Sequence, residues 1–473
     1  MKLRKLLITF SSIIQSLDLF PYARIISSSF TREDGKMPLR YLLTYLIFRQ
    51  GLTLSEDICR FYPDLNNLDP PSKQAVLKRM SILNYDVWHK IQQMFLEKIY
   101  LPMKKKTMKG YILIAIDGTF VTLPNHPVLG SVFGRKTHSK DPEKDGHSAP
   151  QAKVSIAYDV LNKVILDFQI AHQDASEIPL LFKHLEVLED ILKNYKVIIL
   201  ADRYYGSAEL FKYCEMKGYK YLIRAKSNFF KKERASVSPE CMDTVLHILI
   251  HKMWQKRIIR DYIRRYISIY PVMHVRLVKG HYEYDEEYTT SSGFRKLIHH
   301  SLDAEYFSNL LTDEFDTEEI IHTYHVERWD IETNYGTMKT LLDIEQLNTA
   351  NPISITNEIM AKIIFANIEN LIRNAAEDRN CLPDEHLVNN KHVIELCRSS
   401  WFVRSFFSRR LSAKKLKKLV WECERVRVMI REGRHYRRWG KFRNTIHQPH
   451  HRIDGRKNPP LKTIKTGFAT SNH

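Results

Sequence analysis

The chain has little glycine, few cysteines and no long apolar run. Only 16 of its 473 residues are glycine, which favours long helices over tight turns. The six cysteines are scattered without a C-x-x-C pair, so we expect buried thiols in a reducing compartment rather than disulfides or a structural zinc site. No run reaches the roughly 18 apolar residues of a membrane span. We therefore expect a soluble, cytoplasmic protein with no membrane partner.

The first residues, MKLRK followed by LLITFSSII, faintly resemble a signal peptide. They lack a small-residue cleavage site, and the amphipathic pattern continues through Ile14, Leu17 and Leu19. An N-terminal helix is therefore the better interpretation.

Positive charge is concentrated at one end of the chain. The formal net charge is +19, and residues 401–473 hold 20 Lys or Arg against four acidic residues, a net of +16. A basic block of this density suits a polyanion, either nucleic acid or an anionic membrane face. A solvated tail would explain residues 452–473, but not the aromatic residues interleaved with charges from Trp401 to Trp439.

The length of the chain predicts two to four domains. We expect a helical N-terminal domain over residues 1–105 and the first part of an α/β domain over 106–226. An inserted, mainly β subdomain over 227–310 and a helical segment over 311–376 follow, the latter completing the core. Residues 377–473 form a basic, helical C-terminal region with a tail.

Residues 106–226 alternate between strand and helix patterns. Apolar runs rich in β-branched residues predict strands, and i, i+3, i+4 spacing predicts helices. The predicted order is three strands with hairpin links, then helix, strand, helix, strand, which is that of an RNase H-like α/β fold. In sequence these are Tyr111–Leu123, Val154–Ile170 as a hairpin, Glu177–Tyr195, Lys196–Ala201, Ser207–Lys217 and Tyr219–Ala225.

Two acidic residues lie on the predicted core strands. Asp117 follows Leu113–Ile116, and a carboxylate in such surroundings is costly to bury without a partner or a metal. Asp202 ends the strand KVIILA, at the edge where a parallel sheet opens to ligands. Either alone could be a loop acid or a structural ion pair, whereas two on neighbouring strands indicate a site.

A third acidic residue comes from a predicted helix that runs from Tyr324 to Lys339. At 100° per residue, Arg328 lies about 40° and Lys339 about 20° from Glu332 around that helix, so the three share a face. An ordinary i, i+4 surface ion pair is the simpler alternative, and such pairs contribute little. Apolar Ile331 and Met338 flank this charged face, which favours a functional one.

Three segments closely resemble those of DDE transposases of the insertion-sequence "IS-four" group, whose last helix carries Y-x-x-R-x-x-x-E-x6-K. The likeness extends from about residue 30 to residue 376. The matching segments are Ile116-Asp117-Gly118-Thr119, Ala201-Asp202-Arg203-x-Tyr205-x-Ser207 and Arg328-Trp329-x-Ile331-Glu332-x6-Lys339.

The resemblance implies a cut-and-paste transposase with a retroviral-integrase-like core and two Mg2+ or Mn2+ ions per active site. Asp117 would bridge both ions, while Asp202 and Glu332 each hold one. The implied partners are double-stranded DNA, at the element ends and the target, and a second copy of the chain. The implied phosphate- or base-contacting residues are Arg203, Arg328, Lys339 and Trp329.

One position departs from the family pattern. The signature Tyr should stand three residues before Arg328, where this chain has His325. On a straight helix His325 lies about 20° and Tyr324 about 80° from Glu332. His325 would then contact the DNA end, and near pH 6 it would add a positive charge. The alternative is that Tyr324 reaches the DNA by another path.

Two other classes of function remain open at this point. A stand-alone metal-dependent nuclease would share the carboxylates but needs no helical end-binding domain. A domesticated DNA-binding protein would keep the fold and the basic region while losing an acidic residue. Asp117, Asp202 and Glu332 are all present, which favours an active transposase.

Overall fold

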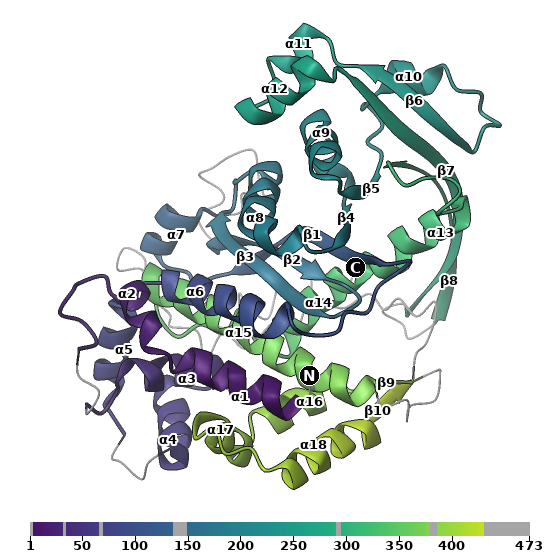
Figure 1. The fold of residues 1–473 in the computed structure, drawn as a ribbon. Helices are drawn as coiled ribbons and strands as arrows, with labels where there is room; N and C mark the ends of the chain where they lie inside the picture. Colours follow the sequence, from purple (N-terminus) through teal and green to yellow (C-terminus); the bar gives the residue numbers. More distant parts are fainter. Residues whose placement is uncertain are drawn as a thin grey trace, which may run out of the picture.

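The fold is organised around one eight-stranded mixed sheet with the order β3-β2-β1-β4-β5-β8-β7-β6 (Figure 1). The computed structural model describes residues 3–31, 35–65, 70–135, 149–289, 295–378 and 386–429. The strands are β1 (Tyr111–Thr122), β2 (Gln151–Asp159), β3 (Val164–His172), β4 (Lys196–Ala201), β5 (Lys220–Arg224), β6 (Asp243–Leu249), β7 (Val272–Thr289) and β8 (Arg295–Ser308).

The first half of the sheet follows the order predicted from sequence. β1, β2 and β3 pair antiparallel, while β4 and β5 continue the sheet parallel to β1. The helices α8 (Glu177–Leu192) and α9 (Ala208–Lys217) lie between these strands in the chain. The expected α/β class, with a large mixed sheet flanked by helices, is confirmed. The order can be predicted because β4 and the first half of β1 are almost wholly apolar and buried, and β2 is almost wholly buried.

The strands of the second half of the sheet lie in residues 227–310, the expected inserted, mainly β subdomain, and they extend the same sheet as β1 to β5. β8 pairs antiparallel with β5 and with β7, and β7 pairs with the edge strand β6. The β7–β8 ladder joins 14 residue pairs, yet its outer part is polar and carries no apolar alternation that would predict strands. Three helices accompany these strands: α10 (Lys231–Ala235), α11 (Lys252–Gln255) and α12 (Asp261–Ile269).

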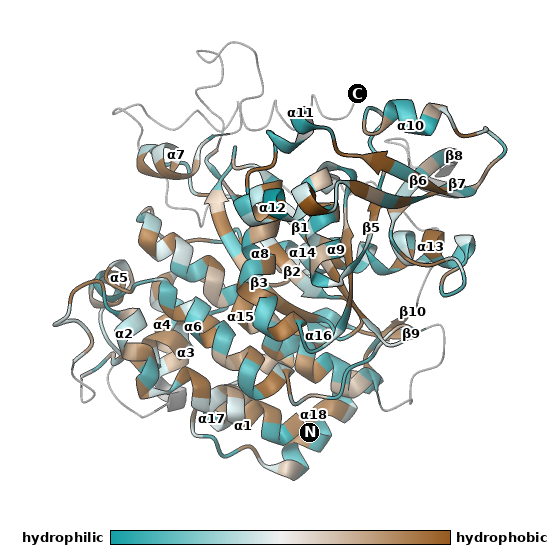
Figure 2. Ribbon diagram, turned by 45° about the horizontal axis from the view of Figure 1, so that its top comes forward, coloured by the Kyte–Doolittle hydropathy of each residue, from teal (hydrophilic) through white to brown (hydrophobic). Residues whose placement is uncertain are grey.

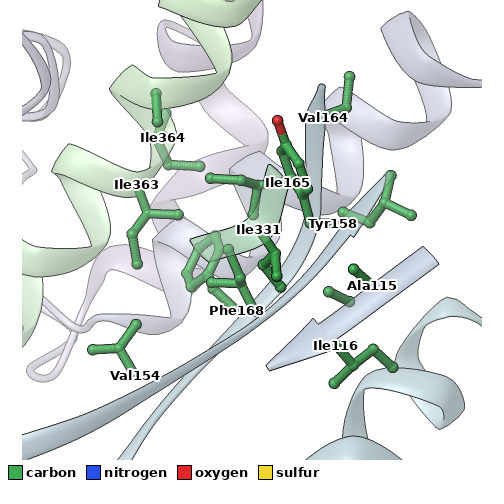
Figure 3. Close-up of a cluster of buried hydrophobic side chains, with 14 of the residues drawn as sticks. Ala115, Ile116, Val154, Tyr158, Val164, Ile165, Phe168, Ile331, Ile363 and Ile364 are labelled. Carbon is green, nitrogen blue, oxygen red and sulfur yellow. The ribbon is translucent and has the colours of Figure 1, made fainter. Parts of the chain in front are cut away.

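Helices cover the two faces of the sheet differently. α8 lies on one face, and the chain after β8 builds the other through α13 (Thr317–His322), the π-helical turn η4 (Thr323–Glu327), α14 (Trp329–Thr340) and α15 (Pro352–Glu377). Figure 3 shows Ile331 of α14 and Ile363 and Ile364 of α15 packed over Phe168 of β3. This apolar layer fixes α14 against the sheet.

The N-terminal helices pack around α15 together with the last helices described. α1 contacts α6, α15 and α17, and Gln15 Nε2 donates to Phe407 O at 2.7 Å. Figure 2 shows hydrophobic residues alternating with hydrophilic ones along the outer helices, as amphipathic packing requires. The N-terminal elements are α1 (Leu3–Ile14), η1 (Leu17–Leu19), α2 (Phe20–Ala23), α3 (Leu39–Phe48), α4 (Leu54–Leu65), α5 (Lys73–Ser81), α6 (Asp86–Phe95) and the π-helical η2 (Leu96–Tyr100).

The remaining elements are short. The 3-10 turn η3 (Arg203–Tyr205) and α7 (Pro127–Phe133) flank the sheet, and β9 (His386–Val388) pairs with β10 (Arg427–Met429). The C-terminal helices are α16 (Asn390–Cys397), α17 (Ser400–Phe407) and α18 (Ala413–Arg425). Most of the predicted basic tail, residues 430–473, lies outside the described residues.

In the described part of the chain, no single helix has the length and apolar character to cross a membrane. One bent pair, Leu3–Ile14 with Leu17–Ala23 at an angle of 48°, meets the requirement by length and composition alone.

A buried ion-pair cluster joins α3, α4 and α15. Arg49, which follows α3, donates from Nε to Asp57 Oδ2 at 2.9 Å and from Nη1 to Glu358 Oε2. All three side chains are at most 3% exposed. The N-terminal helices are thus tied by charge, as well as by apolar packing, to the helix that supports the sheet.

Candidate active site

Asp117 and Asp202 lie at the same edge of the sheet. β1 and β4 run parallel, with Ile116 opposite Ala201 as the last paired residues, so the two acidic residues follow side by side. Parallel strands stand about 4.8 Å apart, which brings the two carboxylates close together. Asp202 follows the end of β4, as predicted, but Asp117 lies inside β1, which continues along β2 to Thr122 beyond the point where its pairing with β4 stops.

The Asp117 carboxyl is in an electrostatically unfavourable position. Burial raises its pKa to about 7, and the nearby carboxylates of Glu332 and Asp202 contribute to the rise. The backbone N–H of Gly118, which donates to Oδ1 at 2.8 Å, and the guanidinium of Arg328 act in the opposite direction. Asp117, Asp202, Glu332 and Arg328 therefore all interact at one place.

α14 packs against β1 and brings Glu332 close enough to interact electrostatically with Asp117. Ile331 is fully buried in the apolar layer, and the neighbouring Asp330 accepts a hydrogen bond from Tyr158 of β2 at 3.1 Å. These two contacts fix the rotation of the helix about its axis. Glu332 then faces Arg328, whose Nη2 donates to Glu332 Oε1 at 2.8 Å.

The prediction of one straight helix from Tyr324 to Lys339 is wrong. The π-helical turn η4 inserts one extra residue before Arg328, whose N–H reaches back five residues to Thr323 O. The Arg328 guanidinium consequently lies 5.0 Å from the centre of the Tyr324 ring. Compared with the family pattern Y-x-x-R, this chain has one more residue between Tyr324 and Arg328. The π-helical turn accommodates that residue, so the two side chains still lie together.

Tyr324 and His325 have different surroundings. The Tyr324 hydroxyl is buried, has no hydrogen-bond partner among the described residues, and interacts electrostatically with Asp202. His325 Nε2 instead contacts the hydroxyl of Tyr306 on β8. Burial, together with Arg224 and Arg328, lowers the pKa of His325 to about 4. The ring is therefore neutral at pH 6, contrary to the positive charge expected there.

The other residues predicted from sequence differ in their exposure to solvent. Trp329, at the start of α14, is 50% exposed. Arg203 directly follows Asp202 and is exposed, with its guanidinium 5.3 Å from the centre of the Tyr204 ring. Lys339 is half-buried near the end of α14, seven residues after Glu332. All three are on the elements that carry the acidic residues.

Sequence reasoning gave no role to two further groups near Asp117. Tyr335 donates from its hydroxyl to Asp117 O at 2.6 Å. The buried hydroxyl of Tyr205 has no hydrogen-bond partner among the described residues and interacts with Asp117, Asp202 and Glu177. Two features of the sequence could have indicated these groups. Tyr335 is one helical turn after Glu332, and Tyr205 follows Asp202 by three residues.

The donor set suits a hard divalent cation. Mg2+ binds carboxylate oxygens and keeps several waters, so it needs few protein ligands. Burial, the main cause of the raised pKa of Asp117, and the smaller repulsion from Glu332 and Asp202 would both be offset by a bound cation. Across the described residues, no three His, Cys, Asp or Glu side chains already converge as a ready metal site. In this structure Glu332 is paired with Arg328 instead.

The raised pKa predicts how the stability of the metal-free protein depends on pH. Between the unfolded value near 4 and about 7, the folded chain holds a proton that the unfolded chain has lost. The contribution of Asp117 is therefore complete below pH 4 and is lost as pH rises through 7. Asp117→Asn should gain stability relative to wild type between pH 5 and pH 8, as measured by urea unfolding in EDTA. If the free energy of unfolding of the variant exceeds that of wild type by the same amount at pH 5 and at pH 8, the prediction is contradicted.

The chain was compared with protein families, with curated protein sequences and with solved structures. The profile of the family described as "Transposase DDE domain" matches residues 108–368, more than half of the chain, and spans Asp117, Asp202 and Glu332. No curated protein sequence matches the chain. The chain is similar to a solved structure described as a cryo-EM structure of piggyBac transposase synaptic complex with hairpin DNA. The TM-score is 0.45 and the identity 11%, over 88% of this chain and 84% of that chain.

Proposed function

Because the chain belongs to the transposase DDE domain family, we propose that it is a cut-and-paste DNA transposase of the IS-four type with an RNase H-like core. One observation carries the proposal: the Asp117 carboxylate interacts electrostatically with Asp202, Glu332 and Arg328 at the point where the pairing of β1 with β4 ends. We further propose that it acts as a homodimer on paired DNA ends in the bacterial cytoplasm.

The chemistry of the site is phosphodiester substitution. Asp117, Asp202 and Glu332 are the residues that would hold two divalent cations, Mg2+ or Mn2+. Such cations, when bound, activate the attacking oxygen and stabilise the leaving 3′-oxygen. Arg328 can bind a phosphate through two parallel hydrogen bonds from its planar guanidinium, and Lys339 can attract one through its positive charge. Tyr324 and Arg203 complete a cationic, hydrogen-bonding rim that suits a DNA backbone.

Exposed Trp329 supports a role in handling a distorted DNA end. An indole that is half exposed beside the reacting centre can stack on an unpaired base. The basic helices α17 and α18, and the basic residues beyond them, suit sequence-independent contacts with phosphates. The helical residues 1–105 are the proposed end-binding region.

The proposal is tested with DNA taken from both sides of the gene. The purified full chain is incubated with Mg2+ and a duplex that carries the inverted repeats flanking the gene, with a supercoiled plasmid as target. We expect breaks at the repeat ends and joined products in the plasmid. Cutting without preference for the ends would indicate a nuclease instead, and binding without cutting would indicate a domesticated DNA-binding protein.

The π-helical turn leads to a prediction about Tyr324. Tyr324→Phe removes only the buried hydroxyl beside Arg328 and Asp202, so we expect end cleavage to fall by about tenfold, the effect of losing one hydrogen bond to a charged group. His325→Phe should have a smaller effect, because its imidazole contacts Tyr306 instead. Cleavage rates at saturating DNA measure both. A larger loss in His325→Phe would assign the contact with DNA to the histidine.

A further inference from the structure

Two buried hydrogen-bond chains meet at the main-chain carbonyl of Asp117. The first comes from α14, where the Tyr335 hydroxyl bridges two paired strands. It accepts from Ile156 N–H of β2 at 3.2 Å and donates to Asp117 O of β1 at 2.6 Å. Asp117 and Ile156 are opposite each other in the ladder. The catalytic helix thus reaches into the sheet at the residue that carries the central carboxylate.

The second chain comes from the other face of the sheet. Ser155 Oγ lies 3.2 Å from Asp117 O and 2.9 Å from His184 Nε2. His184 Nδ1 lies 2.6 Å from Asp167 Oδ2. All three side chains are at most 2% exposed, so they cannot act on a substrate as a nucleophilic triad.

The directions of these hydrogen bonds are determined by the available hydrogens. A serine hydroxyl has one hydrogen, which it needs for Asp117 O, so His184 Nε2 must donate to Ser155. Nδ1 must donate as well, because a carboxylate only accepts. Asp117 O thus accepts two hydrogen bonds, from Ser155 Oγ on one face of the sheet and from the Tyr335 hydroxyl on the other.

Hydrogen bonds to the Asp117 carbonyl fix the position of the main chain at this residue. Glu332 and Asp202 interact unfavourably with its carboxylate, and this repulsion acts to move the middle of β1 away from β4 and α14. The carboxylate itself accepts one hydrogen bond, from the N–H of the next residue. Resistance to the repulsion has to come from the main chain instead.

We propose that Tyr335, together with Ser155 and His184, is a positioning residue that fixes the separation of Asp117 and Glu332 through the Asp117 carbonyl. Tyr335 and Glu332 are one turn apart on α14, so one rigid helix holds the β1 carbonyl and presents the third carboxylate. The inference rests on the proposed function, because it assumes that these two carboxylates share bound cations.

The test is Tyr335→Phe, which removes the hydroxyl and keeps the ring. We expect the Mg2+ concentration for half-maximal cleavage to rise about tenfold or more, as is typical when a group supporting metal ligands is removed. Affinity for the DNA ends in EDTA should stay at the wild-type value. The upward shift of the melting temperature on adding Mg2+ without DNA should also need more Mg2+, which gives a readout independent of activity.

Tyr100→Phe is the matched control. Tyr100 is also buried, and its hydroxyl donates to Asp159 Oδ2 at 2.6 Å rather than to a group of Asp117, Asp202 or Glu332. This variant should lose stability while its Mg2+ requirement stays unchanged. Ser155→Ala tests the second chain, and Ser155→Thr, which retains a hydroxyl, should restore the wild-type requirement. If Tyr335→Phe fails to fold, the Ser155 pair decides the question.

Two results would overturn the positioning role. One is a wild-type Mg2+ requirement in both Tyr335→Phe and Ser155→Ala, and the other is an equal shift in Tyr100→Phe. Failure of the proposed function has a different signature, because wild type itself would then show no metal-dependent cleavage of the DNA ends.

Discussion

Asp117→Asn is expected to lower Mg2+-dependent cleavage of the DNA ends by about a thousandfold, because metal ligation supplies several kcal/mol of transition-state stabilisation. Asp202→Asn and Glu332→Gln should have effects of the same order. Each change removes a charge and keeps the shape of the side chain, so affinity for the DNA ends in EDTA should be retained. Gel-shift and single-turnover cleavage assays measure the two properties separately.

Glu327→Gln is the control for these variants. Glu327 is on the same helical segment, but its charged neighbours are Asp330, His322 and Lys163 rather than the three acidic residues of the site. Cleavage by this variant should stay close to the wild-type rate. Robust cutting by any one of the three site variants would remove that residue from the catalytic centre.

Arg49→Met is expected to destabilise the fold by about 3–5 kcal/mol, since it leaves two buried carboxylates without their partner. Asp57 and Glu358 are both almost completely inaccessible to water and cannot be solvated where they lie. The loss should appear as a lower urea midpoint of unfolding. It should affect the whole chain, because the cluster ties the N-terminal helices to α15, which supports the sheet.

Arg60→Met provides the comparison within the same helical region. Arg60 forms an i, i+4 pair with Glu56, and both side chains are more than half exposed, so its loss should cost less than about 1 kcal/mol. Equal midpoints for the two variants would show that the Arg49 cluster contributes no more than a surface pair. Two separate unfolding transitions in Arg49→Met would show that the helical region unfolds independently of the sheet.

The central strands could be predicted from sequence because burial on both faces leaves a simple pattern. The first half of β1 and nearly all of β4 are continuous apolar runs, each followed directly by an acidic residue, so Asp117 and Asp202 could be found without coordinates. Glu332 could be found because its helix also carries Arg328. In each case the local sequence alone encodes the feature.

The remaining features depend on contacts between distant segments. The π-helical turn that places Tyr324 beside Arg328 leaves no local pattern, and straight-helix angles misplaced both Tyr324 and His325 by one residue. Tyr335 has an ordinary helical position, and its insertion between β1 and β2 follows from how α14 docks. The β7–β8 ladder is stabilised by its long pairing rather than by apolar alternation, which is why the sequence did not predict it.

The docking of α1 against α17 makes completion of the fold dependent on nearly the whole chain. Leu7 and Phe10 on α1 are buried in contacts that include a helix about 390 residues later. At synthesis rates of about 5–20 residues per second, the emerging helix waits roughly 20–80 s for that partner. Until α17 is made, we expect the apolar face of α1 to be covered by the ribosome or by a chaperone. A nascent chain that stops before α17 would therefore expose an apolar surface prone to aggregation.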